Sequence, residues 1–299
     1  MEGPIISIII PFYNAEKFVI ETLESVKNQT FQQWECILID DGSTDDSFNL
    51  IQKYVFNDFR FRLYKRPETI TRGGCGARNY GFKIATGNFI QWFDADDIMD
   101  INMLDIKLKK FDDAVDAVIC KTILFKNITK NIIGTETRID SEMPFIDFFN
   151  GAITYYTPGP MWRKSFLQNL GFLFNTKLLN VQEWEFYCKI LLKKPNIITL
   201  NDTLIFYRKH SNSIWGRVRT KEKIMSQYNA TKSIFYLADT YQKKIAGSYF
   251  LRLYNFFNEL NLLNNLEEKN EVKKEMFDVF YKKPFTFKDT IRLIISMIK

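Results

Sequence analysis

The N-terminal third of the chain alternates between short apolar runs, each suited to a buried strand, and longer amphipathic segments, each suited to a helix. Ile5–Ile10 is typical of the strands, because it is a β-branched run that ends at a proline. The predicted strands are residues 5–10, 34–39, 61–65 and 88–93, and the predicted helices are residues 15–28, 45–56 and 77–85. Ser43 or Thr44 is expected to cap the second helix. Strands that alternate with helices build a parallel sheet, so the chain is predicted to be an α/β protein.

Polar side chains follow three of these predicted strands. Tyr13 and Asn14 follow the first strand, Asp40 and Asp41 follow the second, and the acidic run of residues 94–97 follows the fourth. Parallel sheets bind their ligands beyond the carboxyl ends of the strands, which is where these side chains gather. Any one cluster also fits a solvated loop, but three clusters on one edge predict a binding site.

The acidic run after the fourth strand contains Asp94, Asp96 and Asp97, and Asp100 follows it. Like charges at this spacing repel and raise each other's pKa unless a cation lies among them. Chance, a solvated turn and a metal–phosphate site are the three explanations. Two aspartates one residue apart can share a divalent cation whose other ligands are water and phosphate oxygens. The D-x-D pattern alone is weak evidence for such a site, because many surface loops contain one.

Composition and charge argue against several classes of protein. The 299 residues are 46% hydrophobic, which is enough for one large domain or a domain with a smaller appendage. The formal net charge of +6 is mild, and no Lys/Arg block is dense enough to predict nucleic-acid binding. The scattered cysteines, a start without a basic n-region and the lack of a membrane-length apolar stretch predict a cytoplasmic protein.

The character of the sequence changes near residue 216. Residues 105–215 are mixed and rich in aromatic side chains, whereas the remainder reads as helices without a strand signal. We therefore predict an α/β domain over residues 1–215 and a helical C-terminal region over residues 216–299.

The last segment, residues 282–299, is predicted to be an amphipathic basic helix. Its apolar residues recur at helical spacing, at Phe287, Ile291, Ile294, Ile295 and Ile298. The segment is too short to span a bilayer, but it suits the surface of the inner membrane, where the protein would be peripheral. The alternative is that its apolar face packs on the preceding helices or on a second copy of the chain in a homodimer.

Three segments in the first hundred residues resemble a known family. PIISIIIPFYN (4–14), LESVKNQTFQQWECILIDDGSTDDS (23–47) and GARNYGFKIATGNFIQWFDADD (76–97) are similar to the nucleotide-sugar-binding half of the inverting GT-A glycosyltransferases of family 2. The likeness resumes at VQEWEFYCKIL (181–191) and LIFYRKHSNS (204–213). It implies the GT-A fold, a mostly parallel sheet flanked by helices, and a nucleotide-diphosphate sugar donor. Such enzymes usually use UDP-sugars, and the sequence leaves other nucleotides open.

The resemblance also implies which residues bind the nucleotide sugar. They are Pro11, Phe12, Tyr13, Asn14, Asp41, Arg78, Asp94, Ala95, Asp96 and Arg208. Within this set, residues 11–13 match the loop that flanks the uracil base, and Asp41 matches the residue that hydrogen-bonds it. Arg78 lies in the segment that lines the nucleotide, and Arg208 is placed to offer charge to the diphosphate.

Asp96 and His210, the only histidine of the chain, are the predicted metal ligands. Asp94 and Asp96 match the D-x-D motif of the family, in which the first residue approaches the ribose or sugar and the second ligates Mn²⁺ or Mg²⁺. His210 resembles the family's late histidine, which joins the metal–diphosphate cluster. A lone histidine is otherwise more often a surface or core residue, although a neutral imidazole suits a metal ligand.

The predicted catalytic base is Glu183. The family normally has a Glu-Asp pair that opens a helix, and this sequence has Gln182-Glu183. A glutamate performs the same proton transfer if it reaches the acceptor hydroxyl. A first-turn acid that only stabilises its helix is the alternative role. Glu185 is a second candidate, but it lies about 200° away around the helix, so we expect it to face solvent or an arginine.

Together these residues predict a glycosyltransferase that moves one sugar to a hydroxyl of a surface glycan, a lipid-linked oligosaccharide or a glycoprotein, with inversion at the anomeric carbon. Two alternatives stay open. One is an inactive relative that retains nucleotide recognition, which the Gln182-Glu183 pair favours. The other is a nucleotidyltransferase; the chain lacks a glycine-rich phosphate loop after its first strand, and only RGGCGARN (72–79) leaves room for that activity.

Overall fold

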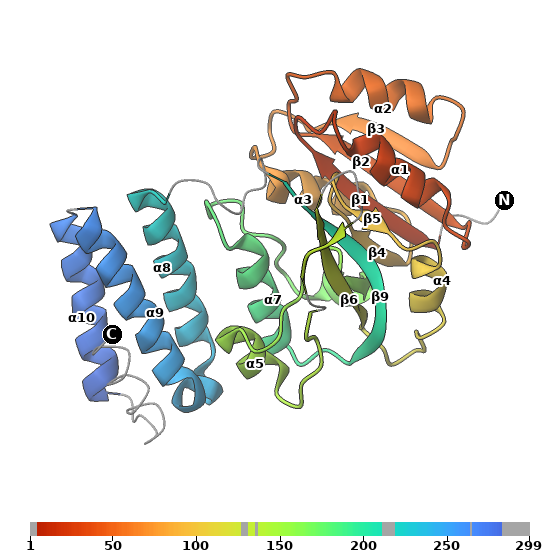
Figure 1. Ribbon diagram of the computed structural model, residues 1–299. Coiled ribbons are helices and arrows are strands. Elements are labelled where there is room, and N and C mark those ends of the chain that lie inside the picture. The colour runs from red at the N-terminus through yellow and green to blue at the C-terminus, as the bar shows by residue number, and fades with distance from the viewer. Residues whose placement is uncertain (1–4, 127–130, 135–136, 211–218, 264, 283–299) are drawn as a thin grey trace. The chain divides into compact units, whose positions relative to one another are not determined.

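The computed structural model describes residues 5–126, 131–134, 137–210, 219–263 and 265–282. The chain forms two compact units that are interleaved along the sequence. The sheet unit comprises Met1–Asp140, Thr154–Thr176 and Lys194–Ser213, and the helical unit comprises Ser141–Ile153, Lys177–Lys193 and Ile214–Lys299. Figure 1 shows the course of the chain through its strands and helices. The division of the chain into domains at residue 215 stays a prediction.

The sheet unit contains every strand that the structure describes. These are β1 (Ile6–Phe12), β2 (Trp34–Asp40), β3 (Phe61–Lys65), β4 (Phe89–Trp92), β5 (Ile98–Met99), β6 (Ala117–Lys126), β7 (Asn131–Ile132), β8 (Pro160–Arg163) and β9 (Ile197–Lys209). Their order is β3-β2-β1-β4-β8-β6-β9-β5, with β7 paired to β6. Pairing is parallel from β3 to β4 and between β6 and β9, and antiparallel in the other described pairs. The predicted α/β class is confirmed, with a sheet that is mixed beyond β4.

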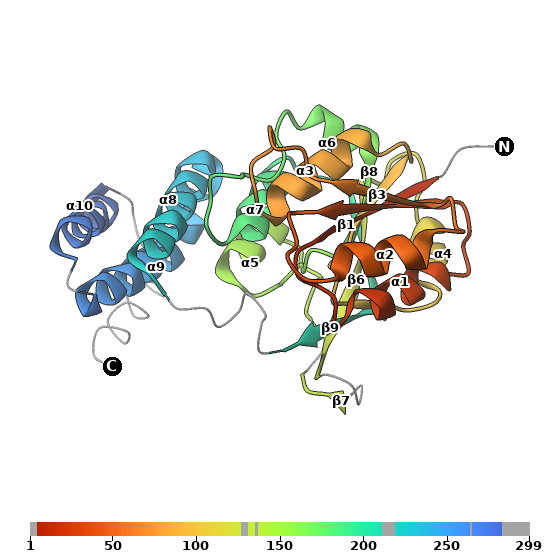
Figure 2. The same cartoon turned by 90° about the horizontal axis from the view of Figure 1, so that it is seen from above.

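Helices cover both faces of this sheet. They are α1 (Val19–Lys27), α2 (Ser47–Val55), α3 (Gly74–Ile84), α4 (Met103–Leu108) and α6 (Lys164–Asn169). Figure 2 shows α1, α2 and α4 on one side of the strands and α3 and α6 on the other. The first three predicted helices and the first four predicted strands therefore exist, with ends that differ by a few residues.

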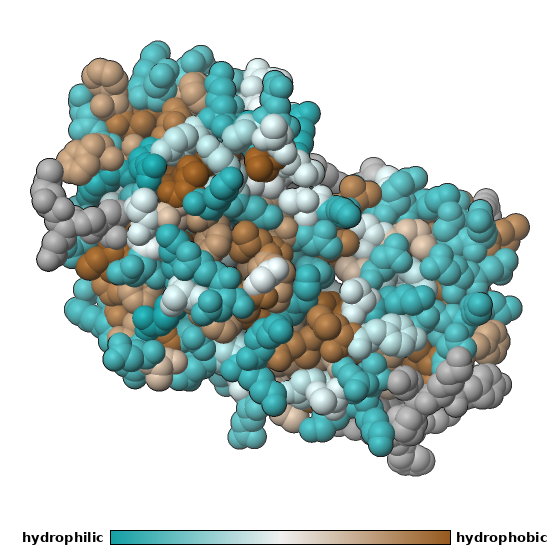
Figure 3. Space-filling view, turned by 180° about the vertical axis from the view of Figure 1, so that it is seen from behind, coloured by the Kyte–Doolittle hydropathy of each residue, from teal (hydrophilic) through white to brown (hydrophobic). Residues whose placement is uncertain are grey.

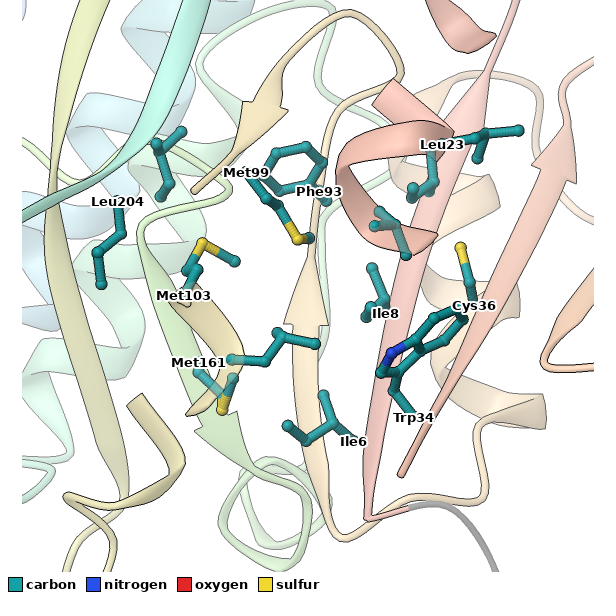
Figure 4. Packing of buried hydrophobic residues seen from close by; sticks show 14 of the residues in the cluster. Ile6, Ile8, Leu23, Trp34, Cys36, Phe93, Met99, Met103, Met161 and Leu204 are labelled. Atoms are coloured by element: carbon teal, nitrogen blue, oxygen red, sulfur yellow. The ribbon is translucent and has the colours of Figure 1, made fainter. Parts of the chain in front are cut away.

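A hydrophobic core fills the face under α1, α2 and α4. Alternate residues of β1, such as Ile6 and Ile8, point into it together with Leu23 of α1 and Trp34 of β2 (Figure 4). The opposite face of β1 meets α3 so closely that a Cβ on Gly81 would lie 2.4 Å from Ile9 Cγ2. Glycine at this position therefore lets α3 approach the sheet.

The helical unit contains α5 (Pro144–Asn150), α7 (Gln182–Leu192), α8 (Lys221–Leu237), a short 3₁₀ helix (Asp239–Tyr241), α9 (Gln242–Leu262) and α10 (Leu266–Lys282). The helices predicted after residue 216 are thus observed as far as residue 282. The predicted amphipathic segment beyond it lies outside the described residues.

The protein's surface carries hydrophobic residues singly and in small groups among hydrophilic ones on the face shown in Figure 3. Within the described ranges, no helix is both long and apolar enough to cross a bilayer.

Candidate active site

Asn14 joins the loop after β1 to the loop after β2. Its backbone has the left-handed φ of 51°, which places its side chain across the neighbouring loop. The amide oxygen accepts a hydrogen bond from the Thr44 backbone N–H at 2.8 Å, and the Asn14 N–H donates to Ser43 Oγ at 3.1 Å. The prediction that Ser43 or Thr44 caps α2 is wrong, because both side chains contact Asn14 and α2 begins after Asp46 without a side-chain cap.

Asp41, at the end of β2, is buried and already holds two protein donors. The Gly73 N–H lies 2.9 and 3.0 Å from its two carboxylate oxygens, and Arg66 Nε donates to Oδ1 at 2.5 Å. Gly73 has a φ of 118°, which disfavours any residue with a side chain. Asp41 thus fixes the loop of residues 66–73 at the edge of the sheet. Its hydrogen bond to uracil stays a prediction, and Arg66 was missed because no local pattern marks it.

The three residues predicted to flank the base, Pro11, Phe12 and Tyr13, differ in their exposure. Phe12 packs in the hydrophobic core, and its carbonyl accepts the Asp41 N–H at 2.9 Å. Tyr13 is 46% exposed, and the Arg72 guanidinium lies 5.2 Å from its ring centroid. Pro11 is the last-but-one residue of β1 and is partly buried. Tyr13 is therefore the aromatic ring that this loop offers to a ligand.

Arg78 of α3 reaches the acidic loop, which we define as residues 94–97. One of its guanidinium nitrogens donates to Asp94 Oδ1 at 2.6 Å. Arg78 is only 8% exposed and also lies over the ring of Phe174, with 5.7 Å between the guanidinium carbon and the ring centroid. This pair neutralises one of the loop's carboxylates from within the protein.

His210 meets the acidic loop although 114 residues separate it from Asp96. Its Nε2 lies 2.9 Å from Asp96 Oδ2, and its ring lies 4.8 Å from that of Phe18 on the centroids. A carboxylate oxygen beside an imidazole nitrogen is a donor set that suits Mn²⁺ and also fits Mg²⁺ through the oxygen. No group of three or more His, Cys, Asp or Glu side chains able to hold a metal occurs among the described residues. A cation here would need further ligands from water or a diphosphate.

Asp97 supports the loop from inside the protein. Its carboxylate is fully buried, and Oδ1 accepts the Arg208 backbone N–H at 2.9 Å, while Oδ2 has no partner in the described part of the chain. Burial, and then the negative charges of Asp96 and Asp94, raise the pKa of Asp97 well above its usual range. Thr22 fixes the same loop, because its hydroxyl hydrogen-bonds the carbonyls of Ala95 at 3.0 Å and Asp97 at 2.8 Å.

Arg208 is buried and holds the acidic loop. Its Nε donates to the Asp96 carbonyl at 2.7 Å, and a terminal nitrogen contacts Glu21 at 2.5 Å. The rings of Phe18 and Phe125 lie 4.8 and 4.6 Å from the guanidinium carbon. This side chain is a support of the loop, and its predicted contact with a diphosphate stays a prediction.

Glu183 belongs to the helical unit, in the first turn of α7. Gln182 beside it donates to the Leu178 carbonyl at 2.7 Å, which ties the start of the helix to the preceding turn. The expectation for Glu185 is wrong: this side chain is buried and pairs with Lys189 at 3.1 Å, one turn further along α7. Glu183 is partly buried, and its role as the base stays a prediction.

The arrangement of strands and helices identifies the fold class. Residues 1–349 of S. aureus TarS, solved in complex with UDP-GlcNAc, match 92% of this chain and 81% of that chain with a TM-score of 0.71 and 20% identity. The mannosyltransferase PcManGT from Pyrobaculum calidifontis, solved with GDP-Man and Mn²⁺, matches 94% and 82% of the two chains with a TM-score of 0.57 and 16% identity. The likeness to TarS confirms the predicted GT-A fold.

The sequence then gives the family. Residues 7–171, more than half of the chain, match the profile of Glycosyl transferase family 2, and the protein belongs to this family. The putative glycosyltransferase EpsH of Bacillus subtilis is 28% identical over 229 residues. That match covers 74% of this chain and 65% of EpsH, whereas the matches to an uncharacterized glycosyltransferase of Haemophilus influenzae and to GlyG of Streptococcus pneumoniae cover 42% and 33% of those proteins.

Proposed function

We propose that the protein transfers a sugar from a UDP-sugar to an acceptor hydroxyl with inversion at the anomeric carbon. The observation that carries this proposal is the 2.9 Å contact between Asp96 and His210 at the end of β4. It brings the D-x-D carboxylate and the late histidine of the family to one point. Asp41 and Tyr13 directly follow the neighbouring strands β2 and β1, so a nucleoside and its diphosphate would lie along this edge of the sheet.

Asp96 and His210 would hold a divalent cation, Mn²⁺ or Mg²⁺. When bound, the cation supplies positive charge against the leaving diphosphate. Asp94 is restrained by Arg78, and Arg208 and Thr22 fix the backbone of the acidic loop, so the loop is organised before a ligand binds. Such preorganised groups stabilise developing charge without having to reorient during the reaction.

Glu183 is proposed as the general base on the strength of its place in the VQEWEFYCKIL segment. Its carboxylate accepts the proton of the acceptor hydroxyl while the hydroxyl oxygen bonds to the anomeric carbon. The bond between that carbon and the diphosphate oxygen breaks on the opposite face, and its electron pair leaves with UDP. One bond forms and one breaks, so the configuration of the sugar inverts.

Thermal unfolding with UDP, with and without Mn²⁺, and again with GDP, tests the donor site. A ligand at about 100 times its dissociation constant stabilises a fold by about 2.7 kcal/mol, which is a readily measured shift. We expect a UDP shift that needs the metal. A shift with GDP and none with UDP would make the donor a GDP-sugar. A UDP shift that does not need Mn²⁺ would remove the cation from the proposal. No shift with either nucleotide would contradict the donor site.

Glu183→Gln tests the base separately from the donor site. We expect UDP release in the presence of acceptor to fall by about 10²- to 10⁴-fold, the usual contribution of a general base, with UDP affinity within a few-fold of the wild type. Glu222→Gln is the matched control, since it removes an exposed acid from the first turn of another helix, α8. Unchanged transfer by Glu183→Gln would remove the base assignment, and UDP binding without transfer by the wild type would favour an inactive relative.

The acceptor and the location of the protein are also proposals. The acceptor is a hydroxyl of a surface glycan, a lipid-linked oligosaccharide or a glycoprotein, and the segment after Pro284 attaches the protein to the inner face of the membrane. The full chain should co-sediment with anionic liposomes, and a chain cut after Pro284 should not. Equal co-sedimentation of the two would contradict this attachment.

A further inference from the structure

Two tyrosines of the sheet unit form a pair beside the acidic loop. The ring centroids of Tyr156 and Tyr207 lie 4.9 Å apart, with 35° between the ring planes. Tyr207 is on β9, immediately before Arg208, whose backbone N–H binds Asp97. Side chains alternate along a strand, so Tyr207 leaves β9 on the face opposite to Arg208 and its contacts with Glu21 and Phe18.

Tyr156 is held by a turn that buried side chains keep in place. The turn of residues 157–160 follows it, and the Gly159 N–H donates to the Tyr156 carbonyl at 2.9 Å. Lys107 of α4 is fully buried and donates to the Gly159 carbonyl at 2.8 Å and to Gln91 at 2.9 Å. Gln91 of β4 in turn donates to the Pro158 carbonyl at 2.8 Å. The turn that positions Tyr156 is thus built on the strand that ends in the acidic loop.

The two phenol hydroxyls have capacity for a ligand. Neither Tyr156 nor Tyr207 forms a hydrogen bond through its hydroxyl within the part of the chain that the structure describes, and both side chains are partly exposed. Burial, and then the nearby charge of Asp94, raises the pKa of Tyr207, and burial with the charge of Asp97 does the same for Tyr156. Hydroxyls that are neither buried nor bonded within the protein are open to water or to a ligand.

The order of the strands indicates which part of the donor they meet. Asp41 and Tyr13 follow β2 and β1, the acidic loop follows β4, and Tyr156 and Tyr207 come from the β8 and β9 side of the sheet. A nucleotide sugar has its base, diphosphate and sugar in the same order. Rings with free hydroxyls suit a pyranose, which offers apolar C–H faces and several hydroxyl groups.

We propose that Tyr156 and Tyr207 form the wall of the site that contacts the sugar of the donor and helps to select it. This inference rests on the proposed function, because it assumes that UDP-sugars bind at this edge.

The test compares UDP with UDP-sugars in wild type, Tyr207→Phe and Tyr156→Phe. Dissociation constants are measured by calorimetry with Mn²⁺ for UDP, UDP-GlcNAc, UDP-Glc and UDP-Gal. For the sugar that the wild type binds most tightly, each variant should raise the ratio of the UDP-sugar constant to the UDP constant about 3- to 10-fold, as expected for one lost hydrogen bond. The UDP constant itself should change less than about 2-fold.

Tyr54→Phe is the matched control, because Tyr54 is a partly buried tyrosine of α2 whose ring packs on Phe61 at the other end of the strands. It should leave both constants unchanged. Loss of fold in a variant appears in its melting temperature, and the phenylalanine substitutions keep the ring and its packing. A ratio unchanged in both variants, with UDP still bound, overturns the sugar wall alone. Failure of the wild type to bind UDP overturns the proposed function on which it rests.

Discussion

The buried carboxyl groups of Glu35, at the start of β2, and of Asp97, in the acidic loop beyond the opposite end of the sheet, differ in their hydrogen-bond partners. Glu35, at the start, accepts hydrogen bonds from Ser7 at 2.7 Å and from the Thr86 backbone and hydroxyl at 2.6 Å each, and pairs with Arg62 at 2.5 Å. At the other end, the acidic loop leaves Oδ2 of the buried Asp97 without a described partner.

This difference appears in the directions of the pKa shifts. Burial raises the pKa of Glu35, but the hydrogen bonds from Thr86 and Ser7 and the contact with Arg62 outweigh it, so the net pKa is lowered. Burial and like charges raise the pKa of Asp97 instead. A carboxylate with all of its partners stabilises the fold, whereas burial beside like charges favours the protonated form of a carboxyl group and costs stability unless a cation offsets the charge.

The largest effect on transfer is expected from a substitution in the acidic loop. This loop lies at the carboxyl edge of the sheet, the edge beyond the C-terminal ends of β1, β2 and β4. Asp96→Asn takes away the carboxylate beside His210 and one of the repelling charges of the loop. Transfer should fall by at least about 10²-fold, the scale for losing one preorganised electrostatic group. The free energy of unfolding should stay equal to that of the wild type or rise. Turnover and denaturant unfolding on the same protein measure both.

Asp105→Asn serves as the control for Asp96→Asn. Asp105 belongs to a surface pair with Lys109 on α4, so its loss should leave turnover unchanged and stability within about 0.5 kcal/mol. If Asp96→Asn instead unfolded the protein and transferred sugar normally when folded, the acidic loop would be a structural element like Glu35.

At the amino edge of the sheet, where β2 begins, we expect a substitution to lower stability and leave UDP binding unchanged. Glu35→Gln keeps an oxygen acceptor but loses the charge that Arg62 and three other donors contact, which should lower the free energy of unfolding by about 1–3 kcal/mol. The UDP constant should stay within about 2-fold of the wild type, because Glu35 lies at the start of β2 and the proposed donor site lies beyond the opposite ends of the strands. Glu24→Gln, at an exposed acid of α1, should change neither quantity. A large loss of UDP affinity in Glu35→Gln would join the two edges into one functional unit.

Acid titration tests the contribution of Glu35 to stability, because its lowered pKa fixes the direction in which that contribution changes with pH. The folded state holds this proton less tightly than the unfolded chain does, whose ordinary value is 4.5. The stabilisation by Glu35 is therefore complete above that pH and is lost as the pH falls through the lower folded pKa. The stability difference between wild type and Glu35→Gln should be constant near neutral pH and shrink below 4.5. A difference independent of pH would show that packing, and not charge, is what the substitution removes.

The sequence predicts the parallel half of the sheet well, because short β-branched runs such as Ile6–Phe12 are apolar throughout and end at turn-forming residues. The two-residue strands β5 and β7 have no such signal and were not predicted. At the site, too, local patterns are not enough. The meeting of Asp96 with His210 was expected only from the family resemblance, since 114 residues separate the two in the sequence.

The supporting contacts of the site were not predictable from local patterns. Thr22 reads as an ordinary helix residue, yet its hydroxyl binds two carbonyls more than 70 positions away. Glu185 was placed by helical geometry toward solvent or an arginine, but its side chain is buried and pairs with Lys189. Periodicity gives the direction of a side chain around its own helix, and only the tertiary contacts decide whether that direction is wet or buried.

The smallest effect on UDP binding is expected from substitution of Asn14, whose hydrogen bonds join the loops after β1 and β2. Asn14→Gly tolerates the left-handed φ of 51° but loses the bonds to Thr44, so the loop between β1 and α1 should loosen. The UDP constant should rise only about 2- to 5-fold, the scale of a single net hydrogen bond. Asn14→Ala adds the strain of a left-handed backbone and should cost about 1 kcal/mol more in unfolding free energy than Asn14→Gly. An unchanged UDP constant in both variants would mean that the edge positions the nucleotide without this brace, through Asp41 and its own two donors.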